Sequence, residues 1–200
     1  SYKTLTKMLP DAITVILARN YWFDFLETVG QKYLSFVRSS LEDKLDKYQK
    51  VVLVSLQHGY DGSRDHLAGI LDNGLIHSNA LQLIDDRKDI LFILKPHPVQ
   101  VVSSDWKNVW QFLNSLEETN DNVVFERVVN TDIFSLLMLS DVHVTMSSSA
   151  IYEAGLLERP SIALCPTLQK GGLMQDAFKV VEDKGLLTRA KLNGLDLVQF

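Results

Sequence analysis

The sequence is poor in the residues that mark fibrous, disordered or disulfide-rich chains. Its 200 residues include 1 cysteine, 5 prolines and 10 glycines, and no Gly-X-Y period runs through them. These absences exclude a collagen, a low-complexity tract and a disordered tail. The hydrophobic share of 46% is enough for a core, and a chain of this length buries roughly 70% of the surface that it exposes when unfolded. We therefore expect one large folded domain or two small ones.

Charge of one sign is also scarce. The 20 Lys and Arg residues stand against 25 Asp and Glu residues, the net charge is −5, and no basic run interrupts the mixture. This pattern argues against a nucleic-acid-binding protein and a polybasic membrane binder, because both need a positive field. The longest apolar runs, such as Ile90–Leu94 and Ala12–Ala18, are far shorter than the roughly 20 residues that cross a bilayer. We expect a soluble chain.

The single cysteine, Cys165, has no partner for an internal disulfide, and no His or second Cys follows it at the spacing of a zinc site. A reducing compartment, and hence the cytoplasm, is the expected location, and we predict neither a metal site nor a cofactor. The sequence begins at Ser1 without a Met or a charged-then-apolar leader, as expected of a domain excised from a longer protein.

The first fifty residues differ in pattern from the rest of the chain. Apolar residues recur there at intervals of three and four, which predicts an N-terminal helical segment at positions 1–50. Beyond it, short apolar runs alternate with helical patterns. Strands are predicted at Val51–Leu56, Ile90–Leu94, Val123–Phe125, Val142–Met146 and Ser161–Leu164. Helices are predicted at His66–Asp85, Trp106–Glu118, Asp132–Leu139, Ala150–Leu157 and Gln175–Lys184, with Gly74 as a candidate break in the first of them. Such alternation is typical of a parallel sheet covered on both faces, so we predict a doubly wound α/β fold for residues 51–200.

Four polar clusters follow predicted strands or lie beyond the last of them. They are Gln57–Ser63, Lys95–Pro98, Ser147–Ser149 with Glu153, and Lys170–Gly172. In an open parallel sheet, ligands bind at the carboxyl ends of the strands, where loops and helix starts converge. We therefore look for the functional site among these clusters.

The three serines form the clearest cluster. A strand that ends at Met146 delivers Ser147, Ser148 and Ser149 to a helix start, where hydroxyls and backbone N–H groups suit an anion. Glu153 follows within the same helix, and its carboxylate suits the two hydroxyls of a ribose linked to the bound phosphate. Serine is also a preferred N-cap residue, so a structural role for the serines stays open.

His97 lies between two prolines. Pro96 and Pro98 restrict the backbone on both sides, so the loop presents the imidazole stiffly beside Lys95. There His97 can donate to a phosphate oxygen and, when protonated, offset charge on a leaving group. A loop histidine with incidental prolines is the alternative, but two anion-suited clusters at different strand ends favour the functional interpretation.

The remaining polar groups carry weaker signals. Gly59 beside His58 lets a ligand approach the backbone, but it fits a tight turn equally well, and the phosphate-loop and dinucleotide patterns are absent. Lys170 is a second candidate phosphate contact, with a solvated loop lysine as the alternative. No nucleophile elbow and no metal-ligand pair stands at a strand end. We interpret three single histidines as packing or surface residues: His66, His77 and His143.

Together, Lys95–Pro98 and the stretch Ser147–Ile162 resemble the C-terminal, nucleotide-binding half of GT-B glycosyltransferases. The resemblance is to enzymes of bacterial surface polysaccharides: sialyltransferases with His-Pro and Ser-Ser motifs, capsule Kdo transferases and CDP-glycerol glycerophosphotransferases. UDP-N-acetylglucosamine 2-epimerase is a more distant likeness. The similarity covers roughly Val51–Leu187.

The resemblance implies a Rossmann-like domain that binds a CMP-, CDP- or UDP-linked donor and transfers a sugar or polyol phosphate, without a metal, to a glycan or lipid-linked acceptor. It implies that His97 is the catalytic contact to the nucleotide phosphate, that Ser147–Ser149 bind the phosphates and that Glu153 holds the ribose. We add Lys95, His58 and Gly59 as candidate substrate-binding residues.

In such enzymes a carboxylate of the N-terminal half is the general base, and residues 1–50 are too short to be that half. Asp72-Asn73-Gly74 departs from the Asp/Glu-Asp/Glu-Gly motif that supplies the base in sialyltransferases. We therefore expect an N-terminal domain or a partner chain to complete the site, and peripheral membrane association is a further expectation. A non-catalytic nucleotide- or partner-binding module and a UDP-sugar epimerase-like enzyme stay open as alternatives.

Overall fold

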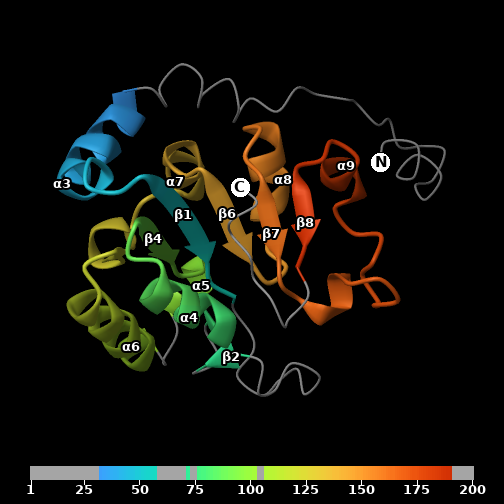
Figure 1. Cartoon of the computed structure of the whole chain (residues 1–200), viewed down its shortest axis with the longest axis horizontal. Coiled ribbons are helices and arrows are strands. Elements are labelled where there is room, and N and C mark those ends of the chain that lie inside the picture. Colours follow the sequence, from blue (N-terminus) through green and yellow to red (C-terminus); the bar gives the residue numbers. More distant parts are fainter. Residues whose placement is uncertain (1–31, 58–70, 73–75, 103–105, 191–200) are drawn as a thin grey trace, which may run out of the picture.

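The structure, a computed structural model, describes residues 32–57, 71–72, 76–102 and 106–190. The main sheet has strands β1 (Lys50–Ser55), β4 (Ile90–Lys95), β5 (Val123–Val124), β6 (Val142–Thr145), β7 (Ser161–Ala163) and β8 (Leu187–Arg189). The helices are α3 (Glu42–Leu45), α4 (Ser78–Asp86), α5 (Pro98–Val101), α6 (Trp106–Thr119), α7 (Ile133–Leu139), α8 (Ala150–Leu156) and α9 (Lys179–Glu182), with short 3-10 turns η2 (Glu126–Val128) and η3 (Pro166–Leu168). Figure 1 shows these elements along the chain.

The six strands are all parallel, in the order β5-β4-β1-β6-β7-β8. The first strand lies in the interior of the sheet, and the chain builds outward on one side of it before it crosses to the other side. Val52 of β1 pairs with Phe92 of β4 on one side and with Val142 of β6 on the other. The direction of winding therefore reverses between β1 and β6, and the predicted doubly wound parallel sheet is confirmed.

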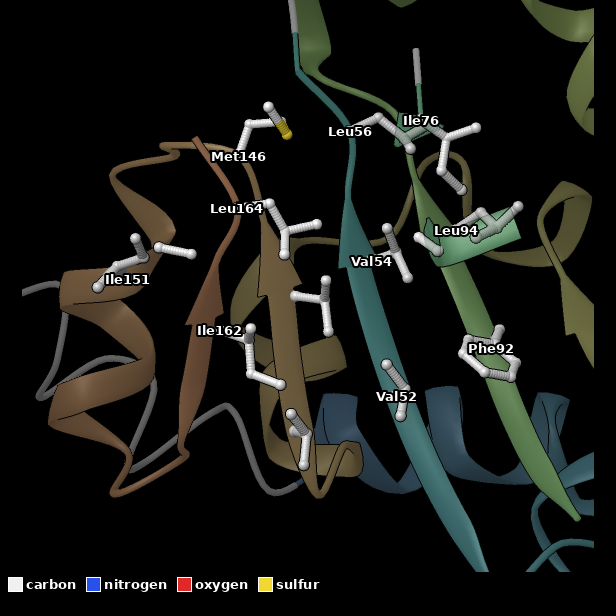
Figure 2. Packing of buried hydrophobic residues seen from close by; sticks show 14 of the residues in the cluster. Val52, Val54, Leu56, Ile76, Phe92, Leu94, Met146, Ile151, Ile162 and Leu164 are labelled. Atoms are coloured by element: carbon white, nitrogen blue, oxygen red, sulfur yellow. The ribbon is translucent and has the colours of Figure 1, made fainter. Parts of the chain in front are cut away.

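The apolar residues of the central strands alternate between two cores. Val52 and Val54 belong to a cluster with Phe92 and Leu94, which helices α4 and α6 cover. Val51 and Leu53 lie in a second cluster on the opposite face, with residues of α7. Figure 2 shows the first cluster, in which side chains from β1 and β4 lie beside those from β6, β7 and α8. Burial of both faces explains why these strands are uninterrupted apolar runs in the sequence.

The N-terminal segment joins the second core. Residues 32–40 are helical, α3 follows them, and Val37 and Leu41 are buried against β1 and β4. This part of the predicted helical segment therefore packs on the sheet, whereas the predicted helices before residue 32 lie outside the described residues. No helix within the described ranges is long and apolar enough to cross a membrane.

Two predicted helices are wrong in part. Within the predicted helix His66–Asp85, β2 (Leu71–Asp72) and β3 (Ile76–His77) pair as antiparallel strands, and the helix begins only at Ser78. In the sequence, the dipeptide Asn73-Gly74 between the two strands is a turn signal that competes with the helical spacing of the leucines. His77 then caps α4, because its Nδ1 accepts a hydrogen bond of 3.0 Å from the Asn79 backbone N–H.

The predicted helix Gln175–Lys184 shrinks to the four residues of α9. Phe178, which precedes it, has a φ of 62° in the left-handed region, and this conformation keeps the helix from extending toward Gln175. Strand β8 was not predicted. Only Leu187 of its three residues is buried, so the strand lacks the apolar run that identified the others.

Candidate functional site

A cavity of about 480 Å³ lies at the carboxyl ends of β1, β4 and β6. Its wall includes Ser55 and Leu56 at the end of β1, the segment Lys95–Pro98 at the end of β4, residues 129–133 up to the start of α7, and residues at the start of α8. The cavity thus sits where the order of strands reverses, the position at which open α/β sheets bind ligands. Of the eight residues predicted for the site, the structure brings five together there: Lys95, His97, Ser148, Ser149 and Glu153.

The backbone of the next helix fixes the imidazole of His97. His97 is the N-cap of α5, and its Nδ1 accepts a hydrogen bond of 3.2 Å from the Val99 N–H. The Gln100 side chain in turn accepts from the His97 N–H at 2.7 Å, which completes a capping box. Because Nδ1 is an acceptor, the proton of the neutral ring lies on Nε2. Nε2 is therefore the donor of this ring.

Lys95, two positions before His97, places a cation in the wall of the cavity. Its Nζ donates to the Val129 carbonyl at 2.6 Å, and the Val128 carbonyl lies 3.5 Å away, so the side chain ties β4 to the turn after η2. Burial lowers the pKa of Lys95, and the nearby carboxylate of Asp132 offsets part of that effect. The ammonium is thus held close to an anionic side chain at the edge of the cavity.

The serine cluster does not cap its helix in the predicted manner. Ser149 is the N-cap of α8, but its side chain makes no capping hydrogen bond. Ser148 Oγ accepts from the Ala150 N–H at 3.2 Å instead. Both serines line the cavity, whereas Ser147 is not part of its wall. The hydroxyl of Ser149 is therefore not committed to the structural role that the sequence left open.

Glu153 presents a carboxylate oxygen that no group of the described chain satisfies. Its Oε2 is buried without a hydrogen-bond partner, and Glu153 lies in the cavity wall. Burial raises the pKa of the Glu153 carboxyl, because the charged form loses water. A buried acceptor of this kind suits the hydroxyl groups of a ligand.

Asp132 is a cavity residue that the sequence analysis missed. Its Oδ1 accepts from the Ser135 N–H at 2.8 Å and caps α7, while its Oδ2 is buried without a partner. In the sequence, an Asp at the start of a helix signals only an N-cap. The proximity of Asp132 to Lys95 and to the cavity depends on the sheet order, which the sequence does not state.

Three further predicted contacts remain, at His58, Gly59 and Lys170. His58 and Gly59 lie outside the described residues, so their assignment stays a prediction. The loop at Lys170–Gly172 is not part of the cavity wall, and its Gly171 N–H donates to the Gln175 side chain at 2.9 Å. Within the described ranges, no three His, Cys, Asp or Glu side chains gather closely enough to hold a metal ion.

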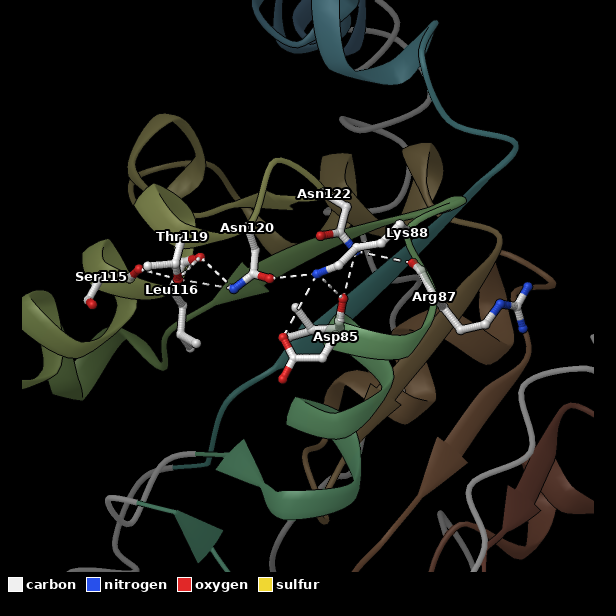
Figure 3. Close-up of polar contacts among 9 residues, drawn as sticks. Asp85, Arg87, Lys88, Ser115, Leu116, Thr119, Asn120 and Asn122 are labelled. Carbon is white, nitrogen blue, oxygen red and sulfur yellow. Dashed lines mark hydrogen bonds and ion pairs between the residues drawn. The ribbon is translucent and has the colours of Figure 1, made fainter.

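A second hollow, of about 580 Å³, lies at the opposite end of the sheet, before β4 and β5. Its polar groups bind one another (Figure 3): Lys88 Nζ donates to Asn120 Oδ1 at 2.7 Å and to the Ile84 carbonyl at 3.0 Å. Asn120 and Asn122 donate to carbonyls at the ends of α6 and α4, respectively. These contacts complete the helix ends, so we assign this hollow a structural role although it is larger than the cavity.

No protein-family model matches the sequence, and no curated protein matches it. Among solved structures, the chain is similar to UDP-GlcNAc 2-epimerase from Neisseria meningitidis bound to UDP-GlcNAc, with 14% identity, a TM-score of 0.56 and coverage of 96% of this chain and 46% of that one. This likeness shows the fold, a Rossmann-like α/β domain, and agrees with the predicted GT-B architecture.

Two further likenesses have lower TM-scores. The C-terminal CMP-Kdo binding domain of WaaA from Acinetobacter baumannii is 14% identical, with a TM-score of 0.47 over 80% of this chain and 83% of that one. The wall teichoic acid polymerase TagF is 24% identical, with a TM-score of 0.41 over 70% of this chain and 29% of that one. The chain thus spans less than half the length of the epimerase and of the polymerase.

Proposed function

We propose that the chain is the donor-binding half of a glycosyltransferase, which transfers a sugar or polyol phosphate from a CMP-, CDP- or UDP-linked donor in the synthesis of a surface polysaccharide. One observation carries the proposal: one cavity at the reversal point of the sheet collects Lys95, His97, Ser148, Ser149 and Glu153 from separate strand ends.

The phosphate side of the ligand lies, in this proposal, against His97 and the serines. The Nε2–H of His97 and the hydroxyls of Ser148 and Ser149 donate to phosphate oxygens, and Ser147 contributes from the preceding position. When the bond from the sugar to the phosphate breaks, negative charge grows on the departing nucleotide, and donors already oriented toward it lower the barrier. His97 is then the catalytic residue, and the chemistry needs no metal at this step.

The ribose lies, in this proposal, against Glu153. The Glu153 carboxylate in the cavity wall accepts from a ribose hydroxyl, and this hydrogen bond offsets the loss of water that raises the pKa of the carboxyl. Lys95 and Asp132 lie beside the same cavity and present a cation and an anion to the rest of the nucleotide. His58 and Gly59, which follow β1 in the sequence, complete the proposed substrate-binding set.

The general base and the acceptor site belong to another part of the enzyme. We place them on an N-terminal domain or a partner chain, with residues 1–50 as the helical segment beside the Rossmann-like domain 51–200. The acceptor is a glycan or a lipid-linked molecule, and we place the enzyme in the cytoplasm, with peripheral attachment to the membrane that carries such acceptors.

A nucleotide-binding screen tests the proposal directly. The melting temperature of the chain is measured with CMP, CDP, UDP, GDP and ADP, with and without a chelator, and calorimetry gives the affinity of any nucleotide that stabilises it. We expect one pyrimidine nucleotide to bind and the chelator to have no effect.

A matched pair of variants separates the ligand contact of His97 from its structural role. His97→Asn keeps an N-cap acceptor for the Val99 N–H but lacks the donor at the Nε2 position, whereas His97→Ala loses both. We expect a loss of affinity of about 10-fold or more in both variants, and a lower melting temperature only in His97→Ala. Unchanged affinity in His97→Asn contradicts the site. Binding of a partner chain without any nucleotide favours the non-catalytic module.

A further inference from the structure

Three buried polar side chains form a chain across adjacent strands and end at the cavity. Ser161 Oγ lies 3.1 Å from His143 Nδ1, and His143 Nε2 lies 2.7 Å from Ser55 Oγ. The exposed fractions of these residues on β7, β6 and β1 are 0%, 0% and 8%. Ser55 also lines the cavity. Side chains inside the sheet are therefore connected to the candidate site.

The imidazole of His143 has one proton to share between its two partners. Burial lowers the pKa of His143 to about 3, so the ring is neutral at ordinary pH. A neutral ring donates from one nitrogen and accepts at the other, which leaves two arrangements. Either Ser55 donates to Nε2 and Nδ1 donates to Ser161, or Ser161 donates to Nδ1 and Nε2 donates to Ser55.

Ser161 decides between the two arrangements. Its hydroxyl is fully buried, and within the described part of the chain His143 is its one hydrogen-bond partner. In the first arrangement the hydroxyl hydrogen of Ser161 has no acceptor, and a buried donor without an acceptor is costly. In the second arrangement the Ser161 hydroxyl donates to Nδ1, and the ring donates from Nε2–H to the Ser55 hydroxyl oxygen. The second arrangement is therefore the stable one, with the proton on Nε2.

Ser55 consequently accepts from the ring and keeps its own hydroxyl hydrogen to donate. The Thr145 hydroxyl donates to the Ser55 carbonyl at 3.1 Å and fixes the backbone at this point. We propose that Ser55 is a ligand-binding residue, whose hydroxyl donates to an acceptor oxygen of the nucleotide in the cavity, and that His143 is a positioning residue, whose Nε2–H donates to Ser55 and leaves the Ser55 hydrogen for the ligand. The inference rests on the proposed function, because it concerns the same ligand.

The first test concerns the ring alone and needs no ligand. The ¹³C and ¹⁵N chemical shifts of His143, measured by NMR on the labelled chain, report which ring nitrogen carries the proton. We expect the Nε2–H form in the wild type. A proton on Nδ1 overturns the inference, because Ser55 then donates into the sheet and not toward the cavity.

The second test compares variants at the two ends of the chain of hydroxyls. Two variants remove one buried hydroxyl each, and a third retains it. Calorimetry measures their affinity for whichever nucleotide of the screen binds the wild type. We expect Ser55→Ala to lose about 3- to 10-fold in affinity, the range for one neutral hydrogen bond. We expect Ser161→Ala, which removes a hydroxyl from the same network, to keep the wild-type affinity. We also expect Ser55→Thr, which retains a hydroxyl at position 55, to have a higher affinity than Ser55→Ala.

The outcomes separate this inference from the proposed function. Equal affinities of the wild type and Ser55→Ala overturn the role of Ser55 and leave nucleotide binding in place. An equal loss of affinity in Ser55→Ala and Ser161→Ala also overturns it, since the network then acts only on stability. A wild type that binds none of the nucleotides overturns both proposals. The Nε2–H form together with a loss confined to Ser55→Ala supports the inference.

Discussion

Arg127 and Asp43 form a two-point ion pair between η2 and α3. Nη1 lies 2.7 Å from Oδ1 and Nη2 lies 3.1 Å from Oδ2, and Nη1 also donates to the Ser40 carbonyl at 3.0 Å. The hydrogen bond from Arg127 lowers the pKa of Asp43. The pair lies in solvent, where such contacts contribute little to stability. Leu41, between Ser40 and Asp43, is in contrast fully buried, so burial should hold this segment on the sheet.

We expect Leu41→Ala to destabilise the whole domain by about 2–4 kcal/mol, because it opens a cavity in the core. Asp43→Asn, which removes the ion pair two positions away, should leave the unfolding midpoint nearly unchanged. Urea unfolding followed by tryptophan fluorescence measures both. If Leu41→Ala unfolds like the wild type, the segment is an appendage and not part of the core.

Glu153→Gln should stabilise the unliganded chain while it weakens nucleotide binding. Burial raises the folded-state pKa of Glu153, so above that pKa the folded chain holds a poorly solvated carboxylate. The stability of the wild type therefore falls as the pH rises through the window from 4.5 to the raised pKa, and the neutral amide avoids this loss. We expect a melting temperature higher by about 1–3 °C at pH 7, allowing for screening by solvent.

Thermal melts of both proteins between pH 4 and pH 8 check the sign. The two curves should meet at low pH, where Glu153 is protonated in the folded and unfolded states alike. A glutamine variant that is less stable at pH 7 would show that the carboxylate has a partner inside the protein.

The strands could be predicted because their signal, a run of adjacent apolar residues, lies within each strand's own sequence. Val51–Val54 and Ile90–Leu94 are apolar throughout because both of their faces are buried, and such short runs are typical of the strands of a parallel sheet. The convergence of Lys95, His97 and Ser148 on one cavity follows from the same prediction, because parallel strands bring their carboxyl ends to one edge.

The residues that escaped prediction depend on distant neighbours. Ser55 reads as an ordinary strand residue and His143 as a packing residue, and they meet only because β1 pairs with β6 across 88 positions. In the sequence Asp132 indicates an N-cap, and it does cap α7. Its place in the cavity wall depends on the adjacent strand β4. The order of strands is set by global packing, so contacts between strands cannot be found from local patterns.

His143→Gln should change the dependence of stability on pH. The pKa of His143 is about 3 in the folded chain and near 6.5 in the unfolded chain. Between these values the unfolded chain binds a proton that the folded chain excludes, so wild-type stability falls as the pH drops below 6.5, by up to about 1.4 kcal/mol per pH unit from this residue. Glutamine does not titrate and lacks this slope.

We expect the glutamine variant to be less stable at pH 7 by about 1–3 kcal/mol, because the hydrogen bonds to Ser55 and Ser161 are disturbed. Its deficit should shrink as the pH is lowered from 7 to 4.5, which urea unfolding at each pH measures. Parallel pH profiles would mean that His143 is not neutral and buried in solution.

Gly172 and Gly171 should respond differently to alanine, although the sequence groups them in one loop. A Cβ at Gly172 would lie 2.3 Å from the Thr167 carbonyl oxygen, a backbone atom that also accepts from the Met174 N–H. Gly171→Ala meets open space and costs only the strain of its φ of 85°, about 1 kcal/mol. We expect Gly172→Ala to cost more, about 2–3 kcal/mol, because the backbone must shift. Since this loop lies outside the cavity wall, neither variant should alter nucleotide affinity in calorimetry. A loss of affinity in Gly171→Ala alone would show that the loop contributes to nucleotide binding.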